Sequence, residues 1–349
     1  MYRLALLGFG NVGRAFARLL LKKQTDLQTQ YGLNFCVTGI ATARHGLAID
    51  PNGLDLEQAL HLVQNGKSLD ELSQLPVTDT LDFLYSVPAD VLFENSPVNH
   101  HNGEPAVSYL RIALERGMHA ITANKGPVVH AYRELTALAA QKGRKFYFES
   151  TVMDGAPIFS LFRAALPAVE VTSFRGILNS TTNLILGRME QGESFEQAVR
   201  YCQQIGLAET DPSADIDGWD AAIKVAALAT VGMGIPLKPE EVERTGIRGL
   251  SPADIAAAAA EGKRWKLVCT AKRENGKVRG RVAPEKVSSS SPLYSVEGSS
   301  SIVEFHTDAL PALSIVEGNP GPETTAYGLL ADFINAIRDS ARRLTFLSG

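Results

Sequence analysis

Apolar and polar positions alternate along the first 149 residues in a way that predicts strands and helices in succession. Short apolar runs of strand length are separated by segments whose apolar residues recur at helical spacing. The runs that predict buried strands are 3–7, 34–40, 89–94, 119–122 and 145–149, and a polar, helix-prone insert covers 55–75. Strands that alternate with helices favour an α/β fold with a Rossmann-type parallel, doubly wound sheet.

From about residue 150 the pattern has fewer crossovers between strand and helix. We expect strands at 169–179, 302–306 and 313–317, a hairpin of 265–272 and 277–282 around Asn275-Gly276, and helices from Leu184 and over 252–261. A last amphipathic helix through 331–338 is expected to return to the first domain. The predicted organisation is two domains: 1–149, completed by about 318–349, and a second α+β domain over 150–317.

A glycine turn follows the first predicted strand. Gly8, Gly10 and Gly13 lie between that strand and a helix whose apolar face includes Phe16. Gly8 permits a tight turn, Gly10 lets backbone approach a pyrophosphate, and Gly13 lets helix and strand pack closely. The residues predicted to bind a dinucleotide at this helix N-terminus are Gly8, Phe9, Gly10, Asn11, Val12 and Gly13. A glycine-rich packing turn is the alternative.

The end of the second strand bears on which dinucleotide is bound. An Asp or Glu usually holds the ribose 2′-hydroxyl of NAD at this place, whereas here the strand ends in Ala41-Thr42-Ala43-Arg44-His45. The absence of an acid and the presence of Arg44 favour NADP, with Thr42 and Arg44 as contacts. NAD stays open, because a solvated loop arginine would give the same pattern.

The most concentrated group of charges precedes a helix that is almost entirely apolar. Glu209, Asp215, Asp220 and Lys224 fall within residues 206–224, and few polar side chains follow. Asp220 and Lys224 are four apart and share a helical face, so an ordinary ion pair explains their spacing. A lysine whose pKa burial can shift, beside carboxylates that can hold an ammonium group, instead predicts proton transfer and substrate anchoring.

Two further candidates lie at the carboxyl ends of predicted strands, where ligands of doubly wound sheets collect. Ser96 follows the strand 89–94, and Lys125 follows 119–122 within Asn124-Lys125-Gly126-Pro127. The turn residues around Lys125 predict a restrained loop position at the crevice. A surface cation is the alternative to a functional lysine there.

Composition excludes several other classes of protein. The 349 residues carry a formal net charge of -4, which provides no basic surface for nucleic acid. No apolar run is long enough to span a bilayer, and the first residues predict a strand rather than a signal peptide, so we expect a cytoplasmic protein. Cys36, Cys202 and Cys269 are widely spaced and are expected to be buried thiols, outside any disulfide or zinc site.

Taken together, these motifs resemble those of the homoserine dehydrogenases over nearly the whole chain. The resemblance rests on the glycine turn at 8–13, on 122–127, on 176–183, on Glu209 to Lys224, and on the glycine turn before the last helix. It implies NAD(P)-linked interconversion of L-homoserine and L-aspartate 4-semialdehyde, a step of threonine and methionine biosynthesis.

The resemblance also implies roles for single residues. Lys224 and Lys125 are the implied acid/base residues, and which of them is the principal one stays open. The residues implied to contact substrate are Glu209, Asp220, Asp215, Gly176, Asn179 and Thr182, and Gly206 and Gly321 are implied to lie near the cofactor. A Na+ or K+ site is implied at Glu149, Val152, Asp154 and Ala156, together with a homodimer through strands of the second domain.

The chain departs from the family pattern in places. Ser180 stands where the family usually has a glycine, and Met153-Asp154-Gly155 replaces a more glycine-rich turn at the cation site. The chain ends at Gly349, so feedback control by threonine through a regulatory extension is not expected. A reductase of a neighbouring amino-acid pathway, which would lack the Glu209 to Lys224 set, and a non-catalytic dinucleotide sensor are the alternative functions.

Overall fold

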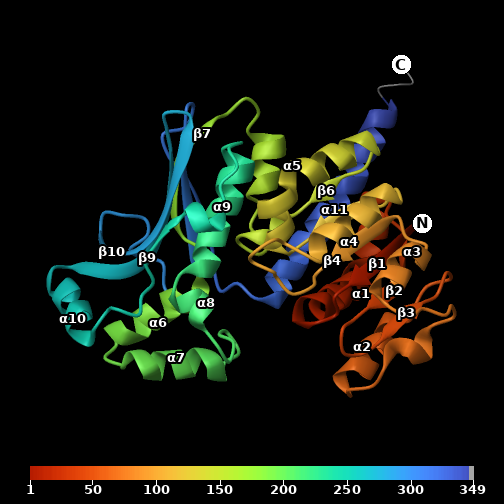
Figure 1. The fold of residues 1–349 in the computed structure, drawn as a ribbon, viewed down its shortest axis with the longest axis horizontal. Helices are drawn as coiled ribbons and strands as arrows, with labels where there is room; N and C mark the ends of the chain where they lie inside the picture. Colours follow the sequence, from red (N-terminus) through yellow and green to blue (C-terminus); the bar gives the residue numbers. More distant parts are fainter. Residues whose placement is uncertain (346–349) are drawn as a thin grey trace. The chain divides into compact units, whose positions relative to one another are not determined.

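The computed structural model describes residues 1–345, and the side chains of residues 1–338. The chain folds into two compact units (Figure 1). The first unit joins Met1–Gly155 to Gly321–Gly349, and the second is Ala156–Pro320. The chain therefore leaves the first unit once and returns to it with its last helix.

The first unit is built on a six-stranded sheet with the order β3-β2-β1-β4-β5-β6. Its strands are β1 (Tyr2–Leu7), β2 (Phe35–Ala41), β3 (Leu47–Ile49), β4 (Val91–Glu94), β5 (His119–Thr122) and β6 (Phe146–Tyr147). All neighbours are parallel except β2 and β3. The predicted doubly wound α/β fold is confirmed. Strand order reverses between β1 and β4, where such sheets bind ligands.

Helices cover both faces of this sheet. Successive residues of a strand point to opposite sides, and in β1 the residues on both sides are apolar and need a covering layer. The helices are α1 (Asn11–Tyr31), α2 (Leu56–Gln64), α3 (Thr80–Ser86), α4 (Ala106–Glu115), α5 (Lys125–Gln141) and α11 (Pro322–Thr345). Leu4 and Leu6 of β1 pack with residues of α1, α2 and α11. Ala5 and Leu7 pack with residues of α3 and α4.

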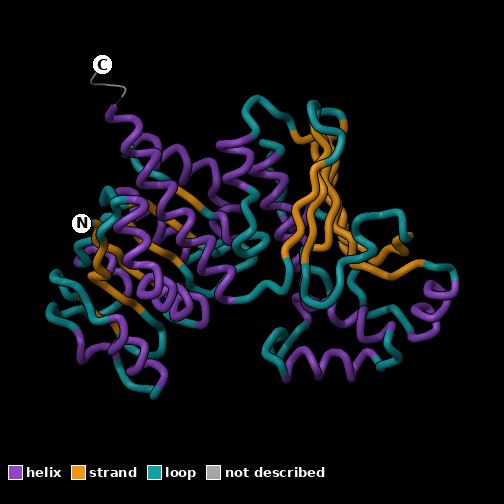
Figure 2. The backbone as a smooth tube through the Cα atoms, turned by 180° about the vertical axis from the view of Figure 1, so that it is seen from behind, coloured by secondary structure: helices purple, strands orange, loops and turns teal. Residues whose placement is uncertain are grey.

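The last helix completes the core of the first unit. α11 packs along α1, and the two helices lie side by side in Figure 1 and Figure 2. Phe333 of α11 is fully buried, and its ring centroid is 6.0 Å from that of Phe93 in β4. Phe16 of α1 belongs to the same cluster, with its ring centroid 4.5 Å from that of Phe93. Segments from both ends of the chain therefore cover one face of the sheet.

The second unit contains another six-stranded sheet, with the order β12-β11-β7-β9-β10-β8. Its strands are β7 (Val171–Ile177), β8 (Glu243–Arg244), β9 (Lys263–Glu274), β10 (Lys277–Ser288), β11 (Ser301–Thr307) and β12 (Leu313–Glu317). Its helices are α6 (Ser180–Glu190), α7 (Phe195–Gln204), α8 (Ser213–Ile216), α9 (Trp219–Gly232) and α10 (Pro252–Ala260). The neighbours are antiparallel except β8 and β10, and the long strands run side by side in Figure 2.

β9 and β10 form the predicted hairpin. Lys277 pairs with Glu274, so the turn consists of Asn275 and Gly276 alone. Their φ angles of 50° and 76° are both positive, as a type I′ turn requires. Each strand has 12 residues and is longer than predicted: β9 extends two residues further at each end, and β10 extends away from the turn as far as Ser288.

Two helices begin earlier than predicted, and each begins directly after an asparagine. α5 starts at Lys125, where the sequence predicts a loop, and Asn124 Oδ1 accepts a hydrogen bond from the Gly126 amide at 3.0 Å. α6 starts at Ser180 rather than at Leu184, and Asn179 Oδ1 accepts from the Thr182 amide at 2.9 Å. Such side-chain bonds satisfy amides that a helix leaves unbonded at its start. Lys125 and Asn179 are thereby fixed at helix N-termini.

Candidate active site

The glycine turn between β1 and α1 has the geometry that a dinucleotide requires. Gly8 has a φ of 97°, and a Cβ there would lie 2.4 Å from the Asn95 carbonyl oxygen. A Cβ on Gly13 would lie 2.2 Å from the Gly8 carbonyl oxygen. A Cβ on Gly10, in contrast, would meet no atom within 4 Å, and no side chain caps α1. Close packing therefore requires glycine at two positions, and the third leaves open space at a helix N-terminus, which fits a pyrophosphate.

A cavity of about 670 Å³ lies beside this turn, lined by Gly8, Thr42 and Ser96 among others. Thr42 Oγ1 accepts a hydrogen bond from the His45 amide at 2.6 Å, which fixes the turn between β2 and β3. Arg44 is exposed in this turn and makes no hydrogen bond or ion pair with another described residue. Of the two contacts predicted for the adenosine half, Thr42 therefore lines this cavity, and Arg44 lies in the same turn with an exposed side chain.

A second cavity, of about 240 Å³, lies at the carboxyl ends of β4 and β5. The predicted cofactor residues Val12, Ser96 and Lys125 all line it. Ser96 lines both cavities, so the two adjoin at this residue. The first unit therefore brings the glycine turn, Ser96 and Lys125 together along one extended site. Phe9 is buried behind the turn, and Asn11 is exposed at its surface.

Glu94 organises these strand ends, although no role was predicted for it. Its carboxylate is fully buried and accepts hydrogen bonds from the Ser96 amide at 2.7 Å and from Thr122 Oγ1 at 2.7 Å. Burial raises the pKa of Glu94, against the hydrogen bonds from Ser96 and Thr122, which lower it. The available signal in the sequence was an acid that ends an otherwise apolar buried strand. Glu94 thus holds the loops after β4 and β5 in one arrangement.

A compact polar cluster lies at the start of α9 in the second unit. Lys224 Nζ donates to the Leu178 carbonyl at 2.6 Å and pairs with Asp220 Oδ2 at 3.1 Å. Asn179 Nδ2 donates to Asp215 Oδ1 at 2.7 Å and to Asp220 Oδ2 at 3.0 Å. Four of the predicted site residues, from the start of α6, from α8 and from α9, therefore meet.

The surroundings of this cluster have little access to water. The side chains of Lys224 and Asp220 are 15% and 18% exposed, and most of α9 after them is buried, as predicted. Burial and repulsion by Asp220 raise the pKa of Asp215, while Asn179 and Lys224 act to lower it. A cation placed between the two carboxylates would relieve their repulsion. The cluster therefore suits a ligand that carries an ammonium group.

The remaining predicted substrate residues lie in different surroundings. Thr182 is buried, and its hydroxyl donates to Asn179 Oδ1 at 2.8 Å, so it supports the cluster from inside α6. A Cβ on Gly176 would lie 2.3 Å from the Ile302 carbonyl oxygen, so the pairing of β7 with β11 requires glycine there. Glu209 is exposed, and its side chain makes no hydrogen bond or ion pair among the described residues.

The predicted cation ligands lie where the first unit ends. They are Glu149, Val152 and Asp154 in the first unit and Ala156, the first residue of the second. The buried Glu149 donates its amide to Asp332 Oδ2 at 2.7 Å, and Asp154 has a φ of 38° and accepts from Thr324 Oγ1 at 3.2 Å. The turn is therefore tied to α11 by side chains of that helix.

Two predicted cofactor residues stand beside helix ends. Gly206 follows α7, and its φ of 73° is one that glycine adopts without strain. Gly321 precedes α11, and its carbonyl accepts from the Thr325 amide at 3.0 Å. Gly206 belongs to the second unit and Gly321 to the first.

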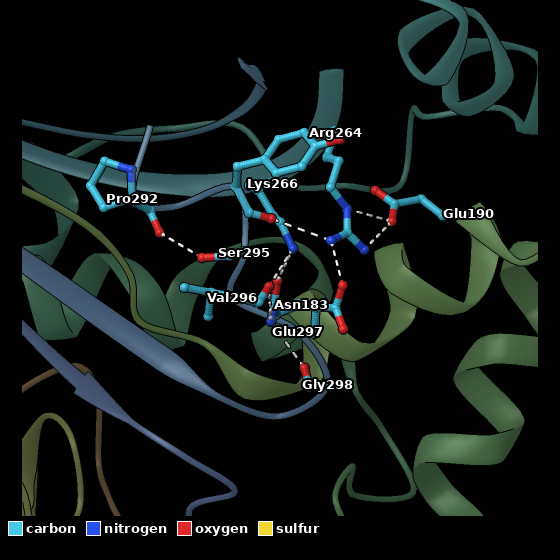
Figure 3. Close-up of polar contacts among 10 residues, drawn as sticks. Asn183, Glu190, Arg264, Lys266, Pro292, Ser295, Val296, Glu297 and Gly298 are labelled. Carbon is cyan, nitrogen blue, oxygen red and sulfur yellow. Dashed lines mark hydrogen bonds and ion pairs between the residues drawn. The ribbon is translucent and has the colours of Figure 1, made fainter. Parts of the chain in front are cut away.

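A second polar network in the second unit braces α6 (Figure 3). Lys266 of β9 is 1% exposed, and its Nζ donates to Asn183 Oδ1 at 2.9 Å and to the Val296 carbonyl at 2.6 Å. Asn183 Nδ2 donates in turn to the Gly298 carbonyl at 3.0 Å. Asn183 lies one helical turn after Asn179. The network therefore holds the serine-rich loop against the helix that supplies the amide of the polar cluster.

The buried Lys266 makes stability depend on pH at alkaline values. Burial, and then repulsion by Arg264, lower the pKa of Lys266 to about 8 from the 10.5 of an exposed lysine. Between these two values the unfolded chain binds more protons than the folded chain, so stability rises with pH across that window. Relative to Lys266→Met, the wild type should gain on the order of 1–3 kcal/mol from about pH 8 to about pH 10.5. Urea unfolding of both proteins across this range tests the gain, and a constant difference would contradict it.

The cysteines offer no prepared nucleophile. Cys202 and Cys269 are buried as predicted, and burial raises their pKa values to about 11 and about 12. Cys36 is only partly buried, which the prediction missed.

Among the described residues, no group of three His, Cys, Asp or Glu side chains is arranged to hold a metal ion. None of the helices described in residues 1–345 combines the length and apolar composition that a membrane span requires.

Two family models match the chain. The model for the homoserine dehydrogenase NAD binding domain matches residues 8–149, and the homoserine dehydrogenase model matches residues 157–334. The chain belongs to the homoserine dehydrogenase family. The resemblance drawn from the motifs is thereby confirmed, and the enzyme is an NAD(P)-dependent oxidoreductase. A non-catalytic sensor and a reductase of another pathway lose their support.

Individual homoserine dehydrogenases are similar to nearly the whole of this chain. The NAD(+)-dependent homoserine dehydrogenase of Pseudomonas canavaninivorans is 36% identical over 347 residues, which cover 98% of each chain. The homoserine dehydrogenase of Methanocaldococcus jannaschii is 35% identical, over 97% of this chain and 99% of the relative. A hyperthermophilic archaeal homoserine dehydrogenase solved in complex with NADPH has a TM-score of 0.82 and 29% identity, over 97% of this chain and 98% of that chain. The Thiobacillus denitrificans enzyme has a TM-score of 0.81 and 28% identity, over 97% of this chain and 73% of that chain.

Proposed function

We propose that this homoserine dehydrogenase uses Lys224 as the proton donor and acceptor at the substrate oxygen, with Lys125 assisting near the nicotinamide. The observation that carries the proposal is the mostly buried amine of Lys224, held by the Leu178 carbonyl and Asp220 beside a second carboxylate. A general acid or base must lie within hydrogen-bond reach of the proton it moves and must be positioned by its neighbours. The two partners of Lys224 supply that positioning.

The carboxylates of the cluster are proposed to hold the amino group of L-homoserine. Asp215 and Asp220 share the Asn179 amide, and their mutual repulsion favours a cationic guest between them. Glu209 is proposed to contribute from the exposed loop before α8. Anchoring the ammonium group fixes the direction in which the four-carbon chain extends, so its hydroxyl can be directed at Lys224.

The cofactor supplies the hydride chemistry. The residues of the first unit proposed to hold it are the glycine turn, Ser96 and Lys125, which line the two adjoining cavities. During oxidation of homoserine, Lys224 Nζ would take the hydroxyl proton, and the oxidised cofactor would take the hydride from the carbon that bears this hydroxyl. During reduction of the semialdehyde, Lys224 returns the proton to the oxygen. A second amine near the reacting oxygen favours the neutral form of the first by charge repulsion, which is the role proposed for Lys125.

NADP is the proposed preferred cofactor, with NAD as the alternative. The β2–β3 turn presents Arg44 and no acid beside the larger cavity. A ribose 2′-phosphate bound at this turn would gain a cation, and residues 42–46 of the turn contain no acid. The relatives support both cofactors, because one is an NAD(+)-dependent enzyme and another is solved with NADPH.

Arg44→Ala is expected to change the affinity for NADPH but not the affinity for NADH. Loss of a charge-assisted contact should weaken NADPH binding about tenfold and leave NADH binding unchanged. Fluorescence titration of the reduced cofactors measures both affinities, and Arg18→Ala, on α1, serves as a control for general loss of positive charge. An equal effect on both cofactors would contradict a contact with the 2′-phosphate.

Further properties proposed for the enzyme extend beyond its active site. Residues 1–149 with about 318–349 are proposed as the dinucleotide domain, and 150–317 as the substrate and dimerisation domain. A homodimer is proposed to form through the strands at the β12 edge, where Val316 is 61% exposed. A Na+ or K+ ion is proposed at the turn that contains Glu149 and Asp154. The enzyme is proposed to act in the cytoplasm, in threonine and methionine biosynthesis.

Initial rates with L-homoserine and each oxidised cofactor test the proposed preference directly. A higher kcat/KM with NADP than with NAD is the expected result. A panel of other hydroxy acids should give rates at least about 10²-fold lower, since they lack the amino group that the carboxylates hold. Comparable rates with hydroxy acids that lack an amino group would contradict the proposed anchoring by Asp215 and Asp220.

A further inference from the structure

Two basic side chains of β9 hold α6 at two points along the helix (Figure 3). Lys266 Nζ donates to Asn183 Oδ1 at 2.9 Å. Arg264 Nε donates to Glu190 Oε2 at 2.8 Å. The two basic residues are two apart on a strand, and their partners are seven apart on a helix, so each pair shares one face of its element. The two bonds together therefore fix both the rotation and the axial position of α6.

Lys266 is the more deeply buried of these two anchors. It is fully enclosed, whereas Arg264 is only partly buried. Its amine also donates to the Val296 carbonyl, which accepts from Asn183 Nδ2 as well, at 3.3 Å. Taking an amine out of water is costly, and apolar side chains of similar volume often stabilise a core equally well or better. Packing alone therefore does not account for a lysine at this position.

The start of α6 carries the amide that joins the polar cluster. Asn179 caps α6 and lies one helical turn before Asn183. Its Oδ1 faces the helix, where it accepts from the Thr182 amide at 2.9 Å. Its Nδ2 faces away from the helix and donates to the carboxylates of Asp215 and Asp220. A displacement of α6 would therefore move this amide relative to both carboxylates.

We propose that Lys266 is a positioning residue for the substrate site. By holding Asn183, it fixes α6 at the place where the Asn179 amide bridges the two carboxylates. The bridge keeps Asp215 and Asp220 at the separation that accepts one ammonium group between them. The inference rests on the proposed function, in which these carboxylates hold the amino group of L-homoserine. Lys266 acts through α6, not by contact with the substrate.

Lys266→Met should raise the KM for L-homoserine about tenfold and leave kcat and the KM for the oxidised cofactor nearly unchanged. Methionine keeps an unbranched apolar side chain but cannot bond to Asn183, so α6 loses its buried anchor. The ammonium group is held before and during the reaction alike, and weaker holding therefore changes KM rather than kcat. Steady-state kinetics at pH 7, with each substrate varied in turn, measure the three constants.

Two further variants separate positioning from stability. Asn183→Ala removes the same bond from the helix side and should raise the KM for L-homoserine in the same way, which provides a second test if methionine does not fit. Val242→Ala is the matched control, because Val242 is buried in the same unit but lies outside α6 and β9. It should lower the melting temperature and leave both KM values unchanged.

A purely structural Lys266 would give a different kinetic result. Partial unfolding lowers the amount of active enzyme and therefore the apparent kcat, but the molecules that remain folded keep the wild-type KM. If Lys266→Met and Asn183→Ala both behave like Val242→Ala, with an unchanged KM for L-homoserine, the proposal is overturned.

Asn179→Ser tests whether Lys266 acts through the Asn179 amide. Serine still caps a helix but is too short to bond to both carboxylates, so the KM for L-homoserine should rise about tenfold. Adding Lys266→Met to this variant should cause no further rise, because the group that it positions is absent. Independent effects would multiply to about 10²-fold, and that outcome would contradict action through Asn179.

Asp215→Asn distinguishes this proposal from the anchoring on which it rests. The expected result is a raised KM for L-homoserine, since one of the two carboxylates loses its charge. A raised KM in Asp215→Asn, with wild-type KM in Lys266→Met and Asn183→Ala, would overturn the positioning role alone. An unchanged KM in Asp215→Asn would overturn the anchoring of the amino group and the positioning role with it.

Discussion

Lys224→Ala is expected to lower kcat for homoserine oxidation about 10²-fold or more, the usual scale for losing a positioned acid or base. The lysine amine lies 2.6 Å from the Leu178 carbonyl and 3.1 Å from Asp220, so alanine removes a group that its neighbours hold in place. NADPH affinity should stay unchanged, because the proposed cofactor residues belong to the first unit, apart from Gly206. Steady-state kinetics and fluorescence titration of NADPH provide the two measurements.

Lys272→Ala is the matched control for this variant. Lys272 belongs to the same unit, but its side chain is 69% exposed and, among the described residues, pairs with Glu274 alone at 3.5 Å. Its replacement should leave kcat and the melting temperature unchanged. Near-normal turnover of Lys224→Ala would contradict the proposed role, and a large loss confined to Lys125→Ala would assign the acid/base role to Lys125 instead.

The fold was predictable where the signal is local. The buried strands, the glycine turn before α1 and the Asn275-Gly276 hairpin each occupy consecutive residues, and their periodicity or turn chemistry is sufficient. β3 and α3 escaped prediction because they have only three and seven residues, too few for a clear period. The early start of α5 was marked by Asn124, but Gly126 and Pro127 also signal a loop, and the helix cap decided between the two readings.

Most residues of the polar cluster could be named from the sequence, but most of the contacts between them could not. The spacing of Asp220 and Lys224 places them on one face of α9, and the ion pair follows from it. The bonds from Asn179 to Asp215 and Asp220 span 36 and 41 residues, so no local pattern contains them. Glu94 was missed for the same reason, since its hydrogen bonds and its burial arise only in the packed sheet.

Burial also explains why charged residues occur at the start of an apolar helix. Lys224, Asp220 and Asp215 are removed from bulk water but keep partners in Asn179 and the Leu178 carbonyl. Interactions between charges are stronger in such surroundings than in water. An amino-acid substrate that adds a cation near the two carboxylates therefore changes the electrostatics of the cluster more than it would at an exposed surface.

Gly13→Ala and Gly10→Ala should separate the two functions of the glycine turn. A Cβ on Gly13 would lie 2.2 Å from the Gly8 carbonyl oxygen, a backbone atom that cannot move unless β1 and α1 shift apart. Overpacking of this kind should cost the first unit about 3 kcal/mol or more. The distorted turn should also weaken NADPH binding about 10²-fold or more, since each factor of ten requires only about 1.4 kcal/mol.

Gly10→Ala, unlike Gly13→Ala, is not expected to lower the stability of the first unit. Its φ of -75° is allowed for alanine, and the added Cβ would meet no atom within 4 Å, so the melting temperature of the cofactor-free enzyme should not fall. The same methyl group would occupy the space through which a pyrophosphate approaches the start of α1, and NADPH affinity should fall about tenfold or more. Thermal unfolding and NADPH titration of both variants test this division. Equal loss of stability in the two variants would show that Gly10 is needed for packing. Unchanged NADPH affinity of Gly10→Ala would show that the pyrophosphate does not bind at this turn.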